Sequence, residues 1–195
     1  MRKVVVTGIG AVSSLGNSFH ESWTSVKKGL SGIAPLTRFD VPPMKWKMSG
    51  ELKGFDAGLY LSQKEITHLD PFVQYAVAAS FMAAEDAGLA SQGLGIRGQG
   101  LEEKNKVSSL ASGGVIIGSS RGGITTIERE LEKIYASRIT HHASRLSPYL
   151  MPSTSVNAAA SYVAQKLGIK GHCLGISNAC SSGANAIGEA YRLIK

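Results

Sequence analysis

Cysteine, tryptophan and long apolar runs are all scarce in this sequence of 195 residues. Its two cysteines, Cys173 and Cys180, are too few for a disulfide framework, and we expect both to remain thiols in a reducing compartment. No apolar run reaches the roughly 18 residues that a transmembrane helix needs, and the first residues lack the apolar stretch of a secretion signal. The sequence therefore predicts a cytoplasmic protein with no membrane association.

Acidic residues are also in the minority, with 14 Asp and Glu against 21 Lys and Arg, which gives a net charge of +7. The basic residues are scattered, and no run is longer than Lys27-Lys28. The compact basic stripe with interleaved aromatic residues that nucleic-acid binding needs is not visible, so no nucleic-acid partner is predicted. An acidic protein partner fits the charge.

Strands alternate with helices along the chain, which is typical of a mainly parallel sheet covered on both faces, an α/β fold. A buried helix is expected from the capping pair Asp70-Pro71 onward, because its sequence is nearly apolar all round. Residues 90–112 are rich in Gly, Ser and Lys and predict a mobile surface insertion. Strands are expected over residues 3–7, 115–118 and 173–178, with a short one near 48–52. Helices are expected over residues 18–28, 71–87, 124–137, 153–167 and 182–195.

The two glycine-rich turns at residues 8–16 and 118–123 match neither phosphate-binding pattern. Neither turn has the Gly-Lys-Ser/Thr ending of a P-loop, and Ser13 stands where a dinucleotide site has its third glycine. Close backbone packing is the better explanation of Gly8-Ile9-Gly10, and no cofactor is predicted.

The candidate reactive residue lies in segment 176–188, where a predicted strand runs into a turn of small residues that presents Cys180 just before a predicted helix. Small neighbours leave room for an incoming carbonyl group, and the start of a helix favours thiolate over thiol. The backbone N–H of Cys180 can also point at an oxyanion. On spacing alone, a buried structural cysteine explains the pattern equally well.

The segment around Cys180 resembles the active-site strand and helix of the beta-ketoacyl-acyl carrier protein synthases. Further matches follow in the family's order along nearly the whole chain. Within the family, the sequence most resembles the second bacterial elongating type. They are residues 4–10 (Val-Val-Val-Thr-Gly-Ile-Gly), 31–33, 38–40, 70–76, 117–119 with 122–123, and 147–148 with 151–154.

The resemblance implies a thiolase-like fold of two similar halves, of which residues 1–195 correspond to the first, with a mainly parallel five-stranded sheet. It also implies an acyltransferase that condenses an acyl thioester with malonyl-acyl carrier protein, with decarboxylation, in fatty acid elongation. Cys180 would be the acyl-accepting nucleophile, with its N–H in the oxyanion hole. The implied partners are acyl carrier protein, a second copy in a homodimer, and the C-terminal half of the enzyme.

By the same resemblance the acyl pocket would include Gly118, Ser119, Arg121 and Leu150. Arg121 departs from the family, which has a small or aliphatic residue there, so it either turns away from the pocket or marks an unusual substrate. Lys64 and Arg145 are the candidate carrier-docking residues, and residues 64–68 have fewer positive charges than is usual in the family's docking stretch.

None of the chain's five histidines matches the family's two decarboxylation histidines, which would lie beyond Lys195. His141-His142 has no third ligand at useful spacing, so no metal is predicted. These 195 residues alone are not expected to complete condensation. Two alternatives stay open: a polyketide-type condensing subunit, and a non-catalytic half that only dimerises.

Overall fold

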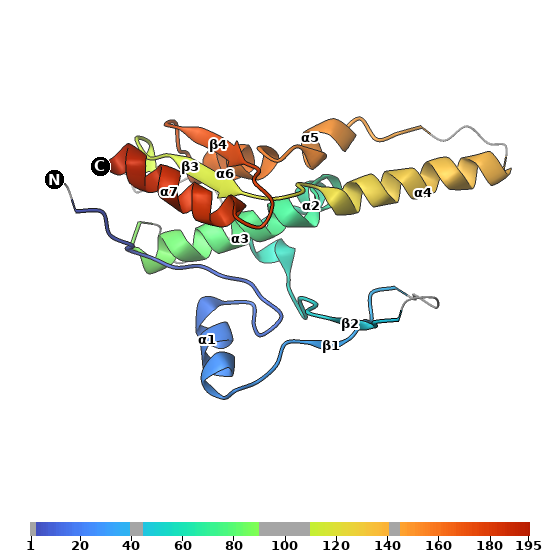
Figure 1. Cartoon of the computed structure of the whole chain (residues 1–195). Coiled ribbons are helices and arrows are strands. Elements are labelled where there is room, and N and C mark those ends of the chain that lie inside the picture. Colours follow the sequence, from blue (N-terminus) through green and yellow to red (C-terminus); the bar gives the residue numbers. More distant parts are fainter. Residues whose placement is uncertain (1–2, 40–44, 90–109, 141–144) are drawn as a thin grey trace.

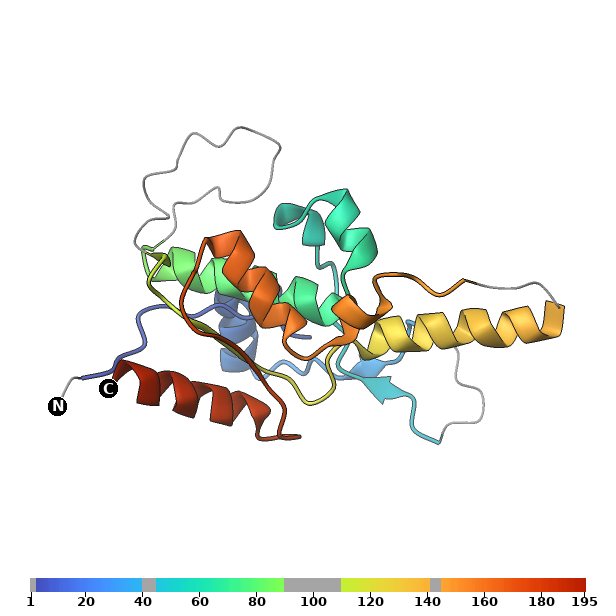
Figure 2. The ribbon, with the colours of Figure 1, turned by 90° about the horizontal axis from the view of Figure 1, so that it is seen from above.

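The computed structural model describes residues 3–39, 45–89, 110–140 and 145–195. Its main body is layered. Helix α3 (Pro71–Asp86) covers α6 (Ala158–Leu167), α6 covers the strand pair β3 (Val115–Gly118) and β4 (Cys173–Ile176), and α7 (Ser182–Ile194) lies on the other face of that pair (Figures 1 and 2). The strands are parallel, with Gly118 opposite Ile176, so their carboxyl ends share one edge of the sheet.

The other elements surround this body. Helix α1 (Phe19–Lys27) and the antiparallel pair β1 (Ala34–Pro35) and β2 (Met48–Ser49) lie below α3 in Figure 1, whereas the long helix α4 (Ile124–Thr140) projects to the side. The turn η1 (Ala57–Leu59) and the short helices α2 (Gln63–His68) and α5 (Leu150–Thr154) connect these parts.

Asp70 fixes both the start of α3 and its connection to α4. One carboxylate oxygen accepts a hydrogen bond from the N–H of Phe72 at 3.0 Å, and Pro71 occupies the first helical position, as predicted. The second oxygen accepts from the N–H of Thr126 at 2.7 Å. Asp70 itself is 1% exposed, so this one buried side chain joins two helices that are distant in sequence.

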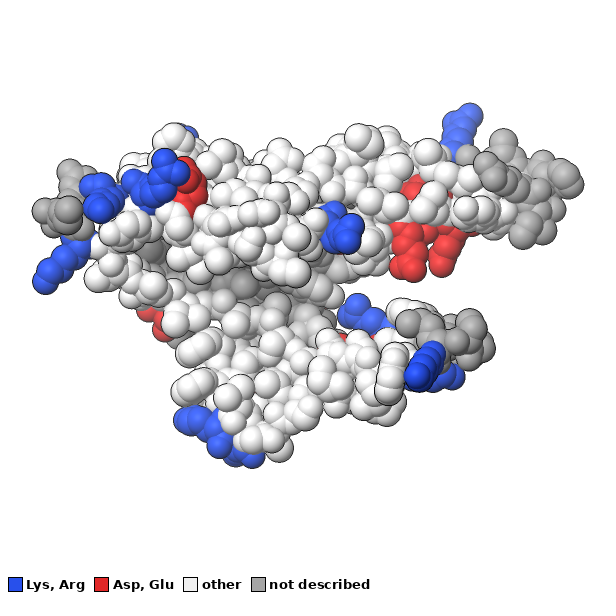
Figure 3. All heavy atoms as spheres, viewed as in Figure 1, with Lys and Arg blue, Asp and Glu red and all other residues white. Residues whose placement is uncertain are grey.

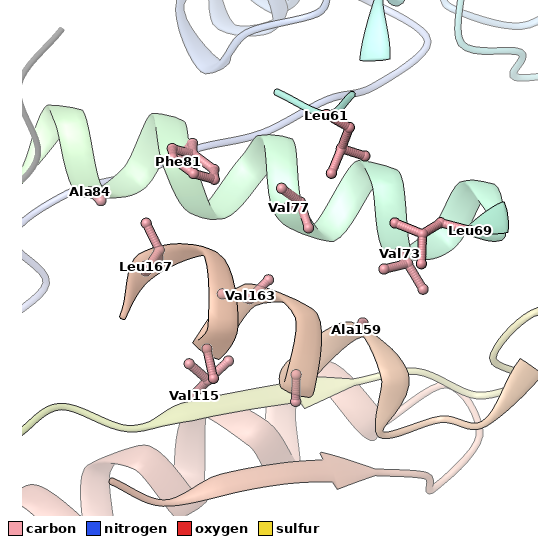
Figure 4. Packing of buried hydrophobic residues seen from close by; sticks show 12 residues of the cluster. Leu61, Leu69, Val73, Val77, Phe81, Ala84, Val115, Ala159, Val163 and Leu167 are labelled. Carbon is pink, nitrogen blue, oxygen red and sulfur yellow. The ribbon is translucent and has the colours of Figure 1, made fainter. Parts of the chain in front are cut away.

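The hydrophobic core lies between α3 and α6 (Figure 4). Small residues of α6, such as Ala159 and Ala160, let the two helices approach closely, and the larger apolar side chains of α3 fill the space between them. Full burial of one such Val, Leu or Phe contributes about 1.5–3 kcal/mol. The larger residues of the cluster are Leu61, Leu69, Val73, Val77, Phe81, Val115, Val163 and Leu167.

The strand expected over residues 3–7 is not formed. Residues 3–12 carry no β-ladder, and Val5 and Val6 are 70% and 80% exposed. A β-branched run becomes a strand only when a neighbouring edge takes its hydrogen bonds, and this run instead leads onto the backbone of α3. An added Cβ at Gly8 or Gly10 would lie 2.2 Å or less from a carbonyl oxygen of α3, which confirms the prediction of close packing.

The single helix expected over residues 153–167 is two helices, α5 and α6, separated at Ser155, whose backbone is extended. The hydroxyl of Ser153 donates to the carbonyl of His68 at 2.6 Å and so holds α5 against α2. The hydroxyl of Ser155 donates to the carbonyl of Met151, which helps to end α5. Helix α6 ends at Gly168, in the left-handed conformation, as predicted.

In the described part of the chain the strands form two separate pairs, and not the five-stranded sheet that was expected. The layered α/β arrangement itself is confirmed. Of the expected insertion over residues 90–112, residues 90–109 lie outside the described residues. The remaining residues join the body: Leu110 packs against the core, and the carbonyl of Ala111 accepts from the N–H of Lys170 at 2.9 Å.

Candidate active site

Cys180 lies on the turn between β4 and α7, two residues before the helix begins, and its side chain is exposed. Ala179, directly before it, has φ of +46°, the only positive φ among the described residues other than glycines. This left-handed conformation is strained for alanine, so the surrounding structure has to hold it in place. Both Cys180 and Cys173 are free thiols, as predicted.

Ser182 is the side chain that holds this turn. Its hydroxyl accepts from the N–H of Asn178 at 2.8 Å and donates to the carbonyl of Ala179 at 2.7 Å, so it ties the two residues before the cysteine to the start of α7. Ser182 is 3% exposed. Ser181 adds a second link, from its hydroxyl to the carbonyl of Asn178 at 2.8 Å. The role of Ser182 was not predicted, although the preference of serine for helix starts could have indicated it.

Gly118 ends β3 where the first turn of α7 touches the strand. A Cβ added there would lie 2.2 Å from the carbonyl oxygen of Ser182 and 2.6 Å from the nitrogen of Gly183. The absence of a side chain at Gly118 therefore sets how closely the helix behind Cys180 approaches the sheet. This packing role was not foreseen for a residue that was predicted to line the acyl pocket.

The loop after β3 runs beside the Cys180 turn. The carbonyl of Ser120 accepts from the hydroxyl of Ser177 at 3.4 Å, and the side chain of Ser119 accepts from the N–H of Gly122 at 3.1 Å. Arg121, between these attached residues, is exposed. The structure thus brings Gly118, Ser119 and Arg121 to the sheet edge that carries Cys180.

Leu150 is the fourth residue predicted for the acyl pocket. It begins α5 and is half-buried. Helix α5 meets the loop after β3 at its opposite end, where the carbonyl of Thr154 is 2.4 Å from a Cβ added to Gly122. Leu150 therefore lies at the end of α5 opposite to the one that meets this loop.

A cavity of about 1050 Å³ lies under α7 and is mainly apolar. It begins at Gly118 and Gly183 and extends along α7 to Ile194, with residues 7–10 and α3 on the other side. Cys180 does not line this cavity, and of the four residues predicted for the acyl pocket only Gly118 does. Ile187, which lines the cavity, is also 74% exposed.

Of the two predicted docking residues, Lys64 lies at a groove of about 950 Å³ between α2, α5 and α6. Lys64 lines this groove and is exposed, and Arg145 is exposed on the segment before α5. The rings of His68 and Tyr149 stack with centroids 4.1 Å apart, which brings these two segments together.

Lys166 forms an ion pair with Glu65 inside the groove, a feature that sequence reasoning missed. Burial tends to raise the pKa of Glu65, but hydrogen bonds from Lys166 and from the N–H and hydroxyl of Ser62 outweigh it and lower the pKa below its ordinary value. The carboxylate of Glu65 therefore stays charged and keeps Lys166 paired.

Charged side chains are spread over the face in Figure 3 without a basic stripe, and acidic residues gather beneath α4. Among the described residues, no helix is both long and apolar enough to cross a bilayer. No three metal-binding side chains come together in the same residues, while His141 and His142 lie outside them.

The structure places a free cysteine on a strained turn between a parallel strand and a helix, in a layered α/β body. Solved ketosynthases have this fold. A β-ketoacyl synthase from Burkholderia phymatum matches all of this chain with a TM-score of 0.73 and 25% identity, and the ketosynthase/chain length factor of ishigamide matches 99% with a TM-score of 0.81 and 24% identity. In each case the match covers 44% of the solved chain.

The family "Beta-ketoacyl synthase, N-terminal domain" matches residues 1–195, and the chain belongs to it. Similar curated proteins include the 3-oxoacyl-[acyl-carrier-protein] synthase 2 of Vibrio cholerae, 36% identical over 99% of this chain, and that of Synechocystis, 35% identical over the whole chain. This chain spans 42% of the length of either relative. Another solved neighbour is a type II polyketide ketosynthase in complex with its acyl-carrier protein, with a TM-score of 0.70 and 23% identity.

Proposed function

We propose that this chain is the nucleophile-bearing part of a condensing acyltransferase, with Cys180 as the residue that is acylated. The observation that carries the proposal is the turn itself, a strained backbone at Ala179 held by Ser182 so that an exposed thiol stands at the start of α7. The start of a helix favours the thiolate form of a nearby cysteine. The relatives named 3-oxoacyl-[acyl-carrier-protein] synthase 2 support the same chemistry.

In the proposed reaction, the thiolate of Cys180 attacks the carbonyl carbon of an acyl thioester on acyl carrier protein. The carrier thiol leaves and takes up a proton, so the acyl group becomes a thioester of Cys180. Malonyl carrier protein then loses CO₂, and the resulting carbanion attacks that thioester, forming a carbon–carbon bond and releasing Cys180 as thiolate. The N–H of Cys180 would stabilise the oxyanion in both attacks.

Further groups are needed for the decarboxylation step, and in this proposal they lie beyond Lys195. Lys64 and Arg145 would meet the acidic carrier protein, and a second copy of the protein would complete a homodimer. A cytoplasmic site of action is part of the proposal, since a cysteine nucleophile needs a compartment that keeps thiols reduced.

Acylation of the thiol tests this proposal directly. A labelled acyl thioester of N-acetylcysteamine should modify Cys180 in the complete protein, as mapped by peptide mass spectrometry, and Cys180→Ser should abolish the label. Cys173→Ser is the matched control, because Cys173 is also an exposed free thiol, on the first residue of β4. Equal, slow labelling of the two cysteines would favour the non-catalytic alternative.

A polyketide-type condensing enzyme would use the same chemistry on a different acyl chain. The observation that bears on this second candidate is Arg121, a charged group where the family has a small or aliphatic residue.

A further inference from the structure

Arg121 is a charged group at the edge of the sheet where acylation is proposed to occur. Because β3 and β4 are parallel and in register, with Gly118 opposite Ile176, the segments that follow them leave the sheet side by side. Arg121 is three residues beyond Gly118, and Cys180 is four residues beyond Ile176. The hydrogen bond between Ser120 and Ser177 joins the two segments directly.

The backbone on both sides of Arg121 is fixed. The loop is closed by the hydrogen bond from the N–H of Gly122 to Ser119, and Gly122 has φ of +65° in close contact with the backbone of Thr154. The Cα of Arg121 is therefore held at the sheet edge that carries Cys180, whereas its exposed side chain can adopt different orientations.

The guanidinium of Arg121 has no acidic partner among the residues that the structure describes. Arg192, on the same body, pairs with Glu189 at 3.1 Å, and Arg38 donates to the hydroxyl of Tyr75. Arg121 stands in a loop of serines and glycines that Ser120 joins to the segment before Cys180, and it has no such contact among the described residues. An arginine fork matches a carboxylate with two parallel hydrogen bonds, whereas a neutral apolar chain passing over it would only remove water from the charge.

We infer that Arg121 binds a carboxylate at the far end of the acyl group carried by Cys180, so that the enzyme prefers short dicarboxylic acyl thioesters over neutral chains of equal length. This inference rests on the proposed function, because it names the substrate class of the same thiol. In the transfer itself the thioester carbonyl still reacts with Cys180 and the carrier thiol still leaves. The distant carboxylate takes no part in bond making and only holds the chain.

The test compares acylation of Cys180 by N-acetylcysteamine thioesters of adipic acid, its monomethyl ester and hexanoic acid, followed by intact-mass spectrometry of the complete protein. These probes lack phosphate, so any preference among them belongs to the acyl end. A charge-assisted pair at a partly open site should favour adipyl over its methyl ester by about tenfold in rate. In Arg121→Gln the two rates should become equal, and Arg121→Lys should keep part of the preference, because the charge remains but the fork does not.

Arg129→Gln is the matched control, because Arg129 is an exposed arginine on α4 and the substitution should leave the preference unchanged. Equal rates for adipyl and its methyl ester in the wild-type protein would overturn the inference while leaving the proposed function intact. Absence of labelling by all three probes would instead overturn the proposed function.

A second set of probes, the same acyl groups on 4′-phosphopantetheine, distinguishes phosphate binding by Arg121 from binding of the acyl carboxylate. If Arg121→Gln slows all of these equally and changes nothing for the N-acetylcysteamine series, the arginine binds the prosthetic arm, and the inference is wrong. A loss confined to the adipyl probe in both series supports it.

Discussion

Gly118→Ala should displace the helix behind Cys180. The new methyl group would lie 2.2 Å from the carbonyl oxygen of Ser182, and backbone on the first turn of α7 would have to withdraw by roughly 1 Å to reach a normal contact distance. Gly118 does not have a positive φ, so alanine fits its backbone conformation and would otherwise stabilise the protein by about 0.4–1 kcal/mol. Overpacking against rigid backbone reverses that sign and should cost about 1–3 kcal/mol.

The same displacement should slow acylation of Cys180. A misplacement of about 1 Å at a reacting group can reduce the rate on the order of 10²-fold. Both effects can be measured on one preparation, stability by urea denaturation and reactivity by the rate of acyl transfer from an N-acetylcysteamine thioester. Ser120→Ala is the matched control, because it lies two residues along the same exposed loop and contributes only its backbone carbonyl to the contact with Ser177.

Because one steric clash causes both effects, stability and the acylation rate should fall together. A Gly118→Ala protein that is as stable as the wild type, and whose Cys180 reacts at the wild-type rate, would show that α7 does not depend on this contact. A protein that loses stability but keeps its acylation rate would show that the turn is positioned by Ser182 alone, without the strand.

Two further predictions concern the buried carboxylates that join α4 to the body. Asp70→Ala removes a helix cap and leaves the N–H of Thr126 buried without its acceptor, so urea denaturation should show a loss of about 2–4 kcal/mol; a loss below about 1 kcal/mol would contradict this role. Hydrogen bonds from Lys133 and from the N–H of Ser147 hold the pKa of Glu130 below its ordinary value of 4.5. A lowered folded-state pKa adds stability that is complete above pH 4.5 and lost as the pH falls further. The stability difference between the wild type and Glu130→Gln should therefore be constant from pH 7 to about 5 and shrink at lower pH. A difference that does not depend on pH would contradict this role of Glu130.

Features that depend on neighbouring residues were predictable from the sequence. The cap at Asp70 with Pro71 placed the start of α3, Gly168 placed the end of α6, and the small residues around Cys180 placed the turn before α7. In each case the deciding hydrogen bond or conformation lies within a few residues of its signal.

Features that depend on distant partners were not predictable in this way. Residues 3–7 have the composition of a strand but no ladder among the described residues, because pairing requires an edge that local sequence cannot specify. The position of α5 against α2 likewise depends on a contact between Ser153 and His68, which are 85 positions apart. The links from Asp70 to Thr126 and from Ser120 to Ser177 belong to the same category.

The candidate site combines both kinds of information: the turn that carries Cys180 was predicted from neighbouring residues, the contact between Gly118 and α7 joins distant segments, and Ser182 was missed although its contacts are local. Cys180 stands out because its immediate neighbours are small, but the turn keeps its shape through Gly118, whose absent side chain admits α7, and through Ser182, whose hydroxyl closes the loop. Neither residue has a reactive role in the proposed chemistry: Gly118 admits the first turn of α7, and Ser182 lies two residues after Cys180. Conservative changes at these two positions should therefore affect acylation more than changes at the exposed positions around them, since strain at Ala179 persists only while its surroundings enforce it.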